Sequence, residues 1–296
     1  MHSLAVRMSV TAAAAMPVVG SVSLAGGQCD AEWARVSLDG PSPRNSMGMV
    51  FDERAGGTLL FSGLNENPRN DTWFFADGRW TQLAPSGPLP AARSAMAMAY
   101  DAGRDRTVMY GGADDSGSMS DTWEWNGSAW TSVPVTGPGA RLLGSMVYDR
   151  ARQVCVLFGG SDGNTWIYDG IQWTRAATTG PGTRFAHQMT YDDRRERTIL
   201  FGGTPDAIVA LGDTWEWNGS MWMRVQISGP QARFAGSLSY DSVRQRCVLF
   251  GGVGRDQIAQ GGQLHGVALR AAARRAWRPG ACASRGASVV PLARRA

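Results

Sequence analysis

The stretch at residues 213–222 reads Asp-Thr-Trp-Glu-Trp-Asn-Gly-Ser-Met-Trp, and residues 121–130 repeat it with one change, Ala129 in place of Met221. Each copy combines an aromatic run, an Asn-Gly pair and a second Trp, the pattern of two short strands joined by a tight turn. Near-identical stretches this far apart predict a repeat architecture. Looser copies begin at Asp71 and Asn164.

The sequence around these stretches repeats with them. Each unit starts at an Arg, and the Arg-to-Arg spacings of 49, 48, 43 and 49 give a period of roughly 48 residues. Seven or eight residues later comes an aromatic-Asp pair, then an apolar strand that ends in Gly-Gly, with Ser62 for the first Gly of the first unit. The five starting arginines are Arg44, Arg93, Arg141, Arg184 and Arg233.

Turn residues divide each unit into four short strands, a to d. Asp-x-x-Arg follows strand a, Gly-Gly ends strand b, Asn-Gly or Asp-Gly ends strand c, and Gly-Pro ends strand d. Four strands joined by short turns form an antiparallel meander, which cannot bury both faces alone. Radial packing of several such sheets buries them, so the sequence predicts an all-β β-propeller of about five blades.

Two features of the repeat predict how neighbouring blades pack. Strand a alternates large and small residues, so Met49 or Met98 of one blade can fill space left by Gly48 or Ala97 of another. We expect the recurring Trp residues to be wedges between blades, although a sugar-stacking platform is the alternative. Cys155 takes the position that Thr holds in three other repeats, as does Cys247, and we expect both to be buried thiols.

The glycine pair, the following aromatic and the spaced Trp resemble the Kelch repeat, in the form found in secreted bacterial Kelch proteins. The resemblance covers about Trp33 to Gly252 and extends to the central domain of galactose oxidase. It implies a Kelch-type β-propeller, although six or seven blades are usual in that family. It also implies that the strand-d-like segment at Trp33 closes the ring against the fifth repeat.

The two ends of the chain depart from the repeat. Residues 1–27 place Arg7 before an apolar stretch and end near Ala25, which indicates a cleaved secretory signal, with a disordered start as the alternative. The propeller is predicted at residues 28–254. Residues 255–296 carry eight Arg and one acid, and are either a basic tail or a frameshifted end that leaves a truncated propeller.

Charge and composition exclude some classes of function. Residues 1–254 hold 21 Arg and 24 acids, so the folded part is mildly acidic and shows no basic stripe for nucleic acid. Pro17 and modest hydrophobicity argue against a membrane span. We expect a monomer that is secreted, periplasmic or on the cell surface.

One face of the propeller carries the variable loops. The b–c loops and the d–a loops share it because strand a crosses the disc and strand b returns. Variable loops on a rigid scaffold are where recognition usually occurs. A ring of Arg44, Arg93, Arg141, Arg184 and Arg233 would suit an anionic partner, whereas pairing with a nearby Asp or carbonyl would make the same residues structural.

Other polar residues give weaker signals. Asp114 and Asp115, with Asp162 and Asp206, are candidate loop contacts, but their spacing matches no calcium loop. His187 is a candidate binding residue in strand a, or simply a structural one. We find no metal spacing, cofactor motif or nucleophile–base pair, and the ligands of a galactose-oxidase-like copper site cannot be assembled.

The sequence therefore predicts a binding or scaffold module without catalytic activity. The expected partner is a protein or a carbohydrate, and an anionic one if the arginine ring is free. The alternative is a propeller hydrolase, lyase or isomerase that acts on a carbohydrate.

Overall fold

A computed structural model describes residues 39–225, 229–254 and 287–290 of the chain, the last four as backbone. Every regular element within these ranges is a β-strand. None of the described residues forms a helix with the length and hydropathy needed to cross a membrane.

Four antiparallel sheets of four strands follow one another along the chain, and we call them blades 1 to 4. Blade 1 contains β1 (Gly48–Asp52), β2 (Gly57–Phe61), β5 (Thr72–Ala76) and β6 (Arg79–Leu83). Blade 2 contains β7 (Ala97–Asp101), β8 (Arg106–Tyr110), β11 (Thr122–Trp125) and β12 (Trp130–Val133). Blade 3 contains β13 (Ser145–Asp149), β14 (Val154–Phe158), β15 (Thr165–Tyr168) and β16 (Trp173–Ala177). Blade 4 contains β17 (Gln188–Asp192), β18 (Arg197–Phe201), β19 (Thr214–Trp217) and β20 (Trp222–Val225).

A fifth sheet has three strands, β21 (Arg233–Asp241), β22 (Arg246–Gly254) and β23 (Ala287–Val290). Two small hairpins complete the described part, β3 (Leu64–Asn65) with β4 (Asn67–Pro68) and β9 (Ala113–Asp114) with β10 (Gly117–Ser118). Each hairpin lies within a b–c loop, of blade 1 and of blade 2.

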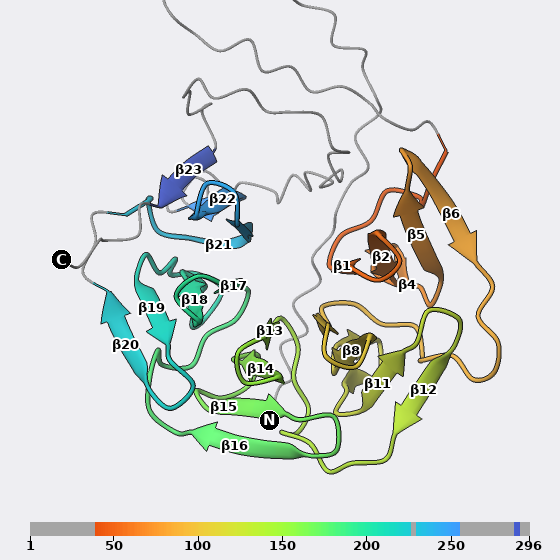
Figure 1. The fold of residues 1–296 in the computed structure, drawn as a ribbon, viewed down its shortest axis with the longest axis horizontal. Helices are drawn as coiled ribbons and strands as arrows, with labels where there is room; N and C mark the ends of the chain where they lie inside the picture. The colour runs from red at the N-terminus through yellow and green to blue at the C-terminus, as the bar shows by residue number, and fades with distance from the viewer. Residues whose placement is uncertain (1–38, 226–228, 255–286, 291–296) are drawn as a thin grey trace, which may run out of the picture.

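The sheets stand around a common axis, which confirms the predicted β-propeller (Figure 1). Strand a of each sheet packs beside strand a of the next, from β1 through β7, β13 and β17 to β21. Strands β6, β12, β16 and β20 form the rim, and the fifth sheet stands apart from blade 1 (Figure 1). The sequence predicted about five blades. The described residues form four complete blades and a fifth sheet of three strands.

The registers of the a–b hairpins follow the repeat. The aromatic residue of strand a lies opposite Thr58, Thr107 or Thr198 in three sheets and opposite Cys155 or Cys247 in the other two. Both thiols are free and buried, as their position predicted. A small side chain is needed there because strand b lies in the interior of each sheet.

Side chains of alternating size fill the space between neighbouring blades. A side-chain carbon placed on Gly48 would lie 2.0 Å from Met98 Sδ and 3.2 Å from Met96 Sδ. The glycine in blade 1 therefore makes room for two methionines of blade 2. The strand-d residues Trp130, Trp173 and Trp222 are 1%, 7% and 7% exposed, which supports the wedge role rather than a stacking platform.

Each repeat arginine lies four residues before strand a in blades 1 to 4, rather than opening it. The second residue after the arginine is left-handed in all five sheets, with φ of 52° at Ser46, 58° at Ala95, 55° at Leu143, 50° at Ala186 and 55° at Ala235. This bend turns the backbone toward the preceding sheet. It allows a chain of hydrogen bonds from sheet to sheet, Ala95 N to Ser46 O (2.7 Å), Leu143 N to Ala95 O, Ala186 N to Leu143 O and Ala235 N to Ala186 O (each 2.8 Å).

Several predictions made from the ends of the chain lie outside the described residues. These are the signal-like segment 1–27, the ring-closing role of Trp33, and the nature of residues 255–296 apart from β23. They stay predictions.

Candidate binding face

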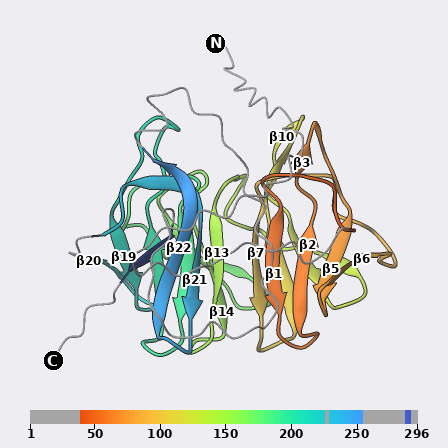
Figure 2. The ribbon, with the colours of Figure 1, turned by 90° about the horizontal axis from the view of Figure 1, so that it is seen from above.

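The four b–c loops, residues 64–70, 113–120, 161–163 and 204–212, lie at the same end of the blades as the d–a turns. Figure 2 shows β3 and β10 projecting at this end, beyond the strands of their blades. We call this end the loop face. Its turns rest on the repeat arginines, whose contacts determine how rigid it is.

The arginines are held by a contact that recurs in all five sheets. The guanidinium Nη1 donates to the carbonyl of the residue eighteen positions later at 2.9–3.1 Å. In blades 1 to 4 this residue comes just after strand b, so the bond ties the d–a turn to the start of the b–c loop, whereas in the fifth sheet it lies within β22. The acceptors are Ser62, Gly111, Gly159, Gly202 and Gly251.

Three of the arginines also form two-pronged ion pairs with the Asp that immediately precedes strand c. Arg93 Nη1 and Nη2 donate to Asp121 at 2.6 and 2.8 Å, and Arg184 donates to Asp213 at 2.8 and 3.0 Å. Arg44 pairs with Asp71 at 2.6 and 2.9 Å. The same carboxylates accept the indole N–H of the Trp two residues later at 2.6–2.7 Å.

The pKa values of these three carboxyl groups show which effect dominates. Burial alone would raise the pKa of Asp213, but hydrogen bonds from Arg184 and Trp215 and the arginine charge outweigh it, so the pKa is lowered. The pKa values of Asp71 and Asp121 are lowered by the same balance. All three are therefore carboxylates at neutral pH, and each neutralises its arginine.

Arg141 and Arg233 depart from this pattern for identifiable reasons. Blade 3 has Asn164 where the other blades have Asp, so Arg141 reaches the more distant Asp162 at 3.4 and 3.5 Å and donates to Pro138 O at 2.6 Å. Burial lowers the pKa of Arg141. Arg233 donates to the carbonyls of Gln231 and Gly251, and no carboxylate pairs with it among the described residues.

These contacts fit the structural role that the sequence left open for the arginines. The side chains of Arg44, Arg93, Arg141 and Arg184 are 3%, 1%, 2% and 5% exposed. A ligand carboxylate could reach the paired guanidinium groups only by displacing an aspartate. The ring therefore supports the loops. Arg233 donates to carbonyls at the same two positions as Arg44, Arg93 and Arg184 do, and it differs from them in having no carboxylate partner within the described residues.

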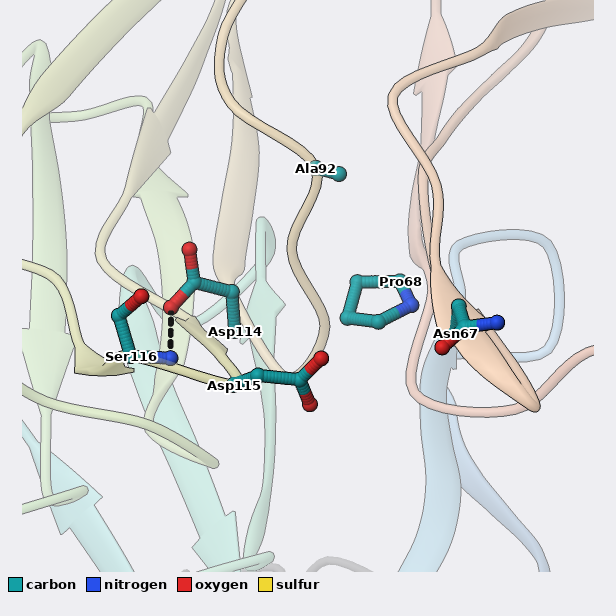
Figure 3. Close-up of a pocket in the computed structure, with 6 residues that line it drawn as sticks. All are labelled: Asn67, Pro68, Ala92, Asp114, Asp115 and Ser116. Carbon is teal, nitrogen blue, oxygen red and sulfur yellow. Dashed lines mark hydrogen bonds between the residues drawn. The ribbon is translucent and has the colours of Figure 1, made fainter.

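Asp114 and Asp115 lie beside an open hollow between the hairpins of blades 1 and 2 (Figure 3). The hollow has a volume of about 320 Å³ and is also lined by Asn67, Pro68, Ala92 and Ser116. Asp114 Oδ1 accepts the Ser116 backbone N–H at 2.7 Å, whereas the Asp115 carboxylate extends toward Pro68 (Figure 3). The Asp115 carboxylate is thus open to the hollow, while Asp114 shapes its turn.

The acidic loop residues do not assemble a cation site in the described ranges. No group of three or more His, Cys, Asp or Glu side chains there has the geometry to hold a metal ion. Asp162 contacts Arg141, and Asp206 Oδ1 accepts backbone N–H groups of its own loop.

His187 lies in the interface between blades 3 and 4 rather than on the loop face. It is 5% exposed, and its ring stands edge-on to Phe158 with centroids 5.5 Å apart. Neither ring nitrogen has a hydrogen-bond partner among the residues that the structure describes. Burial, followed by the nearby Arg184 charge, lowers the pKa of His187 to about 3, so the ring is neutral and packs as an apolar group. The sequence offered His187 as a candidate binding residue, but its side chain is buried, and a ligand on the surface does not reach it.

One feature of the loop face was missed from the sequence. The b–c loop of blade 4 exposes Ile208 at 68% and Val209 at 41%. Asp206 Oδ1 accepts the N–H of both residues at 2.9 and 2.8 Å, which fixes the loop tip and lowers the pKa of Asp206. The signal was an Asp shortly before two apolar residues, an arrangement that favours a side-chain-closed turn.

Comparison with known proteins supports the fold more than the function. No protein-family model matches the chain. The tRNA wybutosine-synthesizing protein 4 of Aspergillus fumigatus is 33% identical over 119 residues, which covers 36% of this chain and only 11% of that protein. A solved structure, "Structure of YjhT", superposes with a TM-score of 0.59 and 15% identity over 77% of this chain and 79% of that one. At this identity the likeness is one of fold, and it agrees with the sheet topology in assigning a β-propeller.

Proposed function

We propose that the chain is a secreted Kelch-type propeller that acts as a binding or scaffold module, and that it contacts a protein or glycan partner through its loop face. The observation that carries the proposal is the recurring clamp of arginine, carbonyl and aspartate beneath loops of unequal length. A buried, charge-paired support keeps loop conformation fixed whatever sequence the loop carries. Binding by preorganised loops loses little conformational entropy.

Two loop regions are the proposed contacts. The hollow beside Asp115 offers polar groups, and the tip at Ile208 and Val209 offers apolar surface. An anionic partner was expected only if the arginine ring were free. Most repeat arginines are paired with aspartates, so we do not propose an anionic partner. A partner with hydroxyl, amide or basic groups suits the hollow better.

The binding proposal is tested with the full chain against a glycan array and a phage-displayed peptide library. We expect saturable binding that is weakened at least about tenfold by Asp115→Ala or Ile208→Asp, since a contact of about 1.4 kcal/mol corresponds to that factor. Ile171→Asp, an exposed residue of the c–d turn of blade 3, is the matched control and should bind normally. Parent-like binding by both Asp115→Ala and Ile208→Asp would place the binding surface elsewhere, and so would a larger loss in Ile171→Asp than in either of them.

Secretion is proposed from residues 1–27 alone. A fusion of residues 1–40 to alkaline phosphatase, expressed in a bacterium, should be exported and cleaved near Ala25 or Gly27. An uncleaved, cytoplasmic fusion would refute secretion without affecting the binding proposal.

A further inference from the structure

Three Asn-x-Ser/Thr triplets occur in the sequence, and this is the acceptor pattern for N-linked glycans. They begin at Asn70, Asn126 and Asn218, and none has Pro in the middle. The pattern is short and often occurs by chance, so the surroundings of each Asn decide whether it can be modified. The structure separates the three triplets into two kinds.

Asn126 and Asn218 lie in the c–d turns of blades 2 and 4, between β11 and β12 and between β19 and β20. The rim strands follow these turns, so both triplets lie at the periphery of the propeller (Figure 1). Residues 126–128 are all exposed, whereas in the second triplet Ser220 is exposed and Asn218 is half-buried. Both triplets are therefore within reach of an enzyme that acts on the folded chain.

In both turns the Ser hydroxyl donates to the side-chain oxygen of the Asn. Ser128 Oγ lies 3.0 Å from Asn126 Oδ1, and the same contact from Ser220 to Asn218 measures 2.9 Å. Each Oδ1 also accepts the backbone N–H groups of the second and third residues after the Asn, at 2.8–2.9 Å. All of these donors meet Oδ1, and within the described ranges neither Nδ2 donates to another group. The amide nitrogen is left open to solvent.

This arrangement suits the chemistry of glycan attachment. Hydrogen bonds polarise the groups that make them, so three donors on Oδ1 make the Nδ2 protons of the amide more acidic. Attachment removes one of these protons and joins Nδ2 to the anomeric carbon of a sugar. The bond from that carbon to a phosphate oxygen of the donor breaks, and its electron pair leaves with the phosphate.

Asn70 carries the same pattern without this arrangement. The hydroxyl of its triplet belongs to Thr72, which is 1% exposed and whose Oγ1 accepts the Trp130 indole N–H at 3.1 Å between blades 1 and 2. The middle residue, Asp71, is held by Arg44. An enzyme could bind this triplet only after blade 1 had opened locally.

We propose that Asn126 and Asn218 are attachment sites for N-linked glycans and that Asn70 is not. The donor is an oligosaccharide joined to a polyprenyl pyrophosphate. The inference rests on the proposed secretion, because N-linked glycans are added to secreted proteins. Strand c runs from the loop face to the c–d turn, so glycans at these turns leave the loop face uncovered.

The two sites differ in how freely their turns can move. A side-chain carbon placed on Gly219 would collide with Arg152 Nε, whereas one placed on Gly127 would meet no atom within 4 Å. The guanidinium of blade 3 thus packs against the second turn, and nothing packs against Gly127 in this way. Asn126 is therefore the better acceptor of the two.

The proposal is tested on the purified full chain with an oligosaccharyltransferase that accepts Asn-x-Ser/Thr and with its lipid-linked oligosaccharide. Synthetic peptides of residues 65–75, 121–131 and 213–223 present the same triplets without the fold. All three peptides should be modified. In the folded chain Asn126 should react fastest and Asn218 more slowly. Asn70 should react at least about tenfold more slowly than Asn126, because its triplet needs local opening. Mass spectrometry of digested product locates each glycan.

Matched variants remove or add a site. Asn126→Asp and Asn218→Asp should each abolish one glycan and still fold, because Asp169 Oδ1 accepts the N–H groups of Ile171 and Gln172 at 2.8 Å in the same turn of blade 3. The reverse change, Asp169→Asn with Ile171→Ser, should add a glycan to blade 3.

A folded chain that stays unmodified at positions 126 and 218, although their peptides react, would overturn the inference. Equal rates at Asn70 and Asn126 would do so too, since the contacts would then not decide. Unreactive peptides beside a standard acceptor peptide that reacts would show that these triplets are not acceptors. The reaction uses purified protein, so its result does not depend on export. A cytoplasmic fusion in the export experiment, beside a modified folded chain, would refute secretion and leave the two turns as competent acceptors.

Discussion

Among single residues, the repeat arginines show how the same position can be interpreted as ligand-binding or structural. The sequence locates all five arginines, but it does not show the carboxylate that each one pairs with. Asp71, Asp121 and Asp213 follow their arginines by 27 to 29 residues. The number of residues between them is set by a b–c loop whose length varies. Only the folded blade shows that the carboxylate and the guanidinium meet.

The clamp predicts a large effect on stability. Asp213→Ala leaves Arg184, 5% exposed, without its counter-charge, and removing one partner of a buried pair costs about 3–5 kcal/mol. We expect a loss near the lower end, about 3 kcal/mol in urea unfolding, since Asp213 is itself 14% exposed. The control Asp115→Ala should cost less than about 0.5 kcal/mol. Equal, small losses would mean that Arg184 is free to meet a ligand.

His187 predicts a pH dependence whose sign follows from its environment. Its pKa is about 3 in the folded protein against 6.5 as an ordinary value, so between these limits only the unfolded chain binds the proton. Stability is therefore complete above pH 6.5 and falls as the pH is lowered toward 3. The loss is about 2 kcal/mol at pH 5, from about 1.4 kcal/mol per pH unit.

The variant His187→Met isolates this effect, because Met96 holds the equivalent place in blade 2. Urea unfolding at about pH 7.5 and about pH 5 should show a smaller loss for the variant than for the parent protein. Parallel losses in the two proteins would mean that the imidazole is not the group that titrates.

Among the elements, the strands follow from local pattern, whereas the bends before them do not. Gly-Gly, Asn-Gly and Gly-Pro pairs mark where strands end, and the registers of the a–b hairpins match the repeat alignment. The left-handed residue before strand a in blades 1 to 4 carries no such mark, since it is Ser46, Ala95, Leu143 or Ala186 rather than Gly. Its conformation is stabilised by a hydrogen bond to the neighbouring sheet, an interaction that lies outside any single repeat.

That bend predicts an unusual stabilising substitution. Ala95 has φ of 58°, and a residue with a Cβ in this region costs about 1 kcal/mol more than Gly. Ala95→Gly should raise the unfolding free energy by up to about 1 kcal/mol, reduced by the greater freedom of Gly in the unfolded chain. Ala95→Val should lower it by at least about 1 kcal/mol because a branched side chain is less tolerated there. If thermal unfolding shows Gly to be worse than Ala, the backbone strain is not the controlling factor.

For the whole molecule, the propeller was predictable because one local solution recurs, but the number of complete blades was not. Each unit must bury two faces of a sheet, and this requirement alone leads to radial packing. The number of complete units depends on where the repeat stops, and among the described residues it stops at a fifth sheet of three strands. The same limit applies to function, since the clamps recur from unit to unit while the loops they support do not.

Radial packing predicts a gradient of protection within each blade. Strand b is buried from both sides, with Val108, Met109, Leu157 and Leu200 at 0% exposure, whereas in blades 2 to 4 the buried Trp of strand d is followed by two exposed residues on the rim. Amide hydrogen exchange should therefore be slowest in β8, β14 and β18 and fastest in β6, β12, β16 and β20, because exchange from an inner strand requires separation of adjacent blades. Mass spectrometry of exchanged peptides measures this order directly. Rim strands protected as well as β14 would mean that the blades open as rigid units from the axis rather than fraying from the rim, and the wedge role of Trp130, Trp173 and Trp222 would then need to be reassigned.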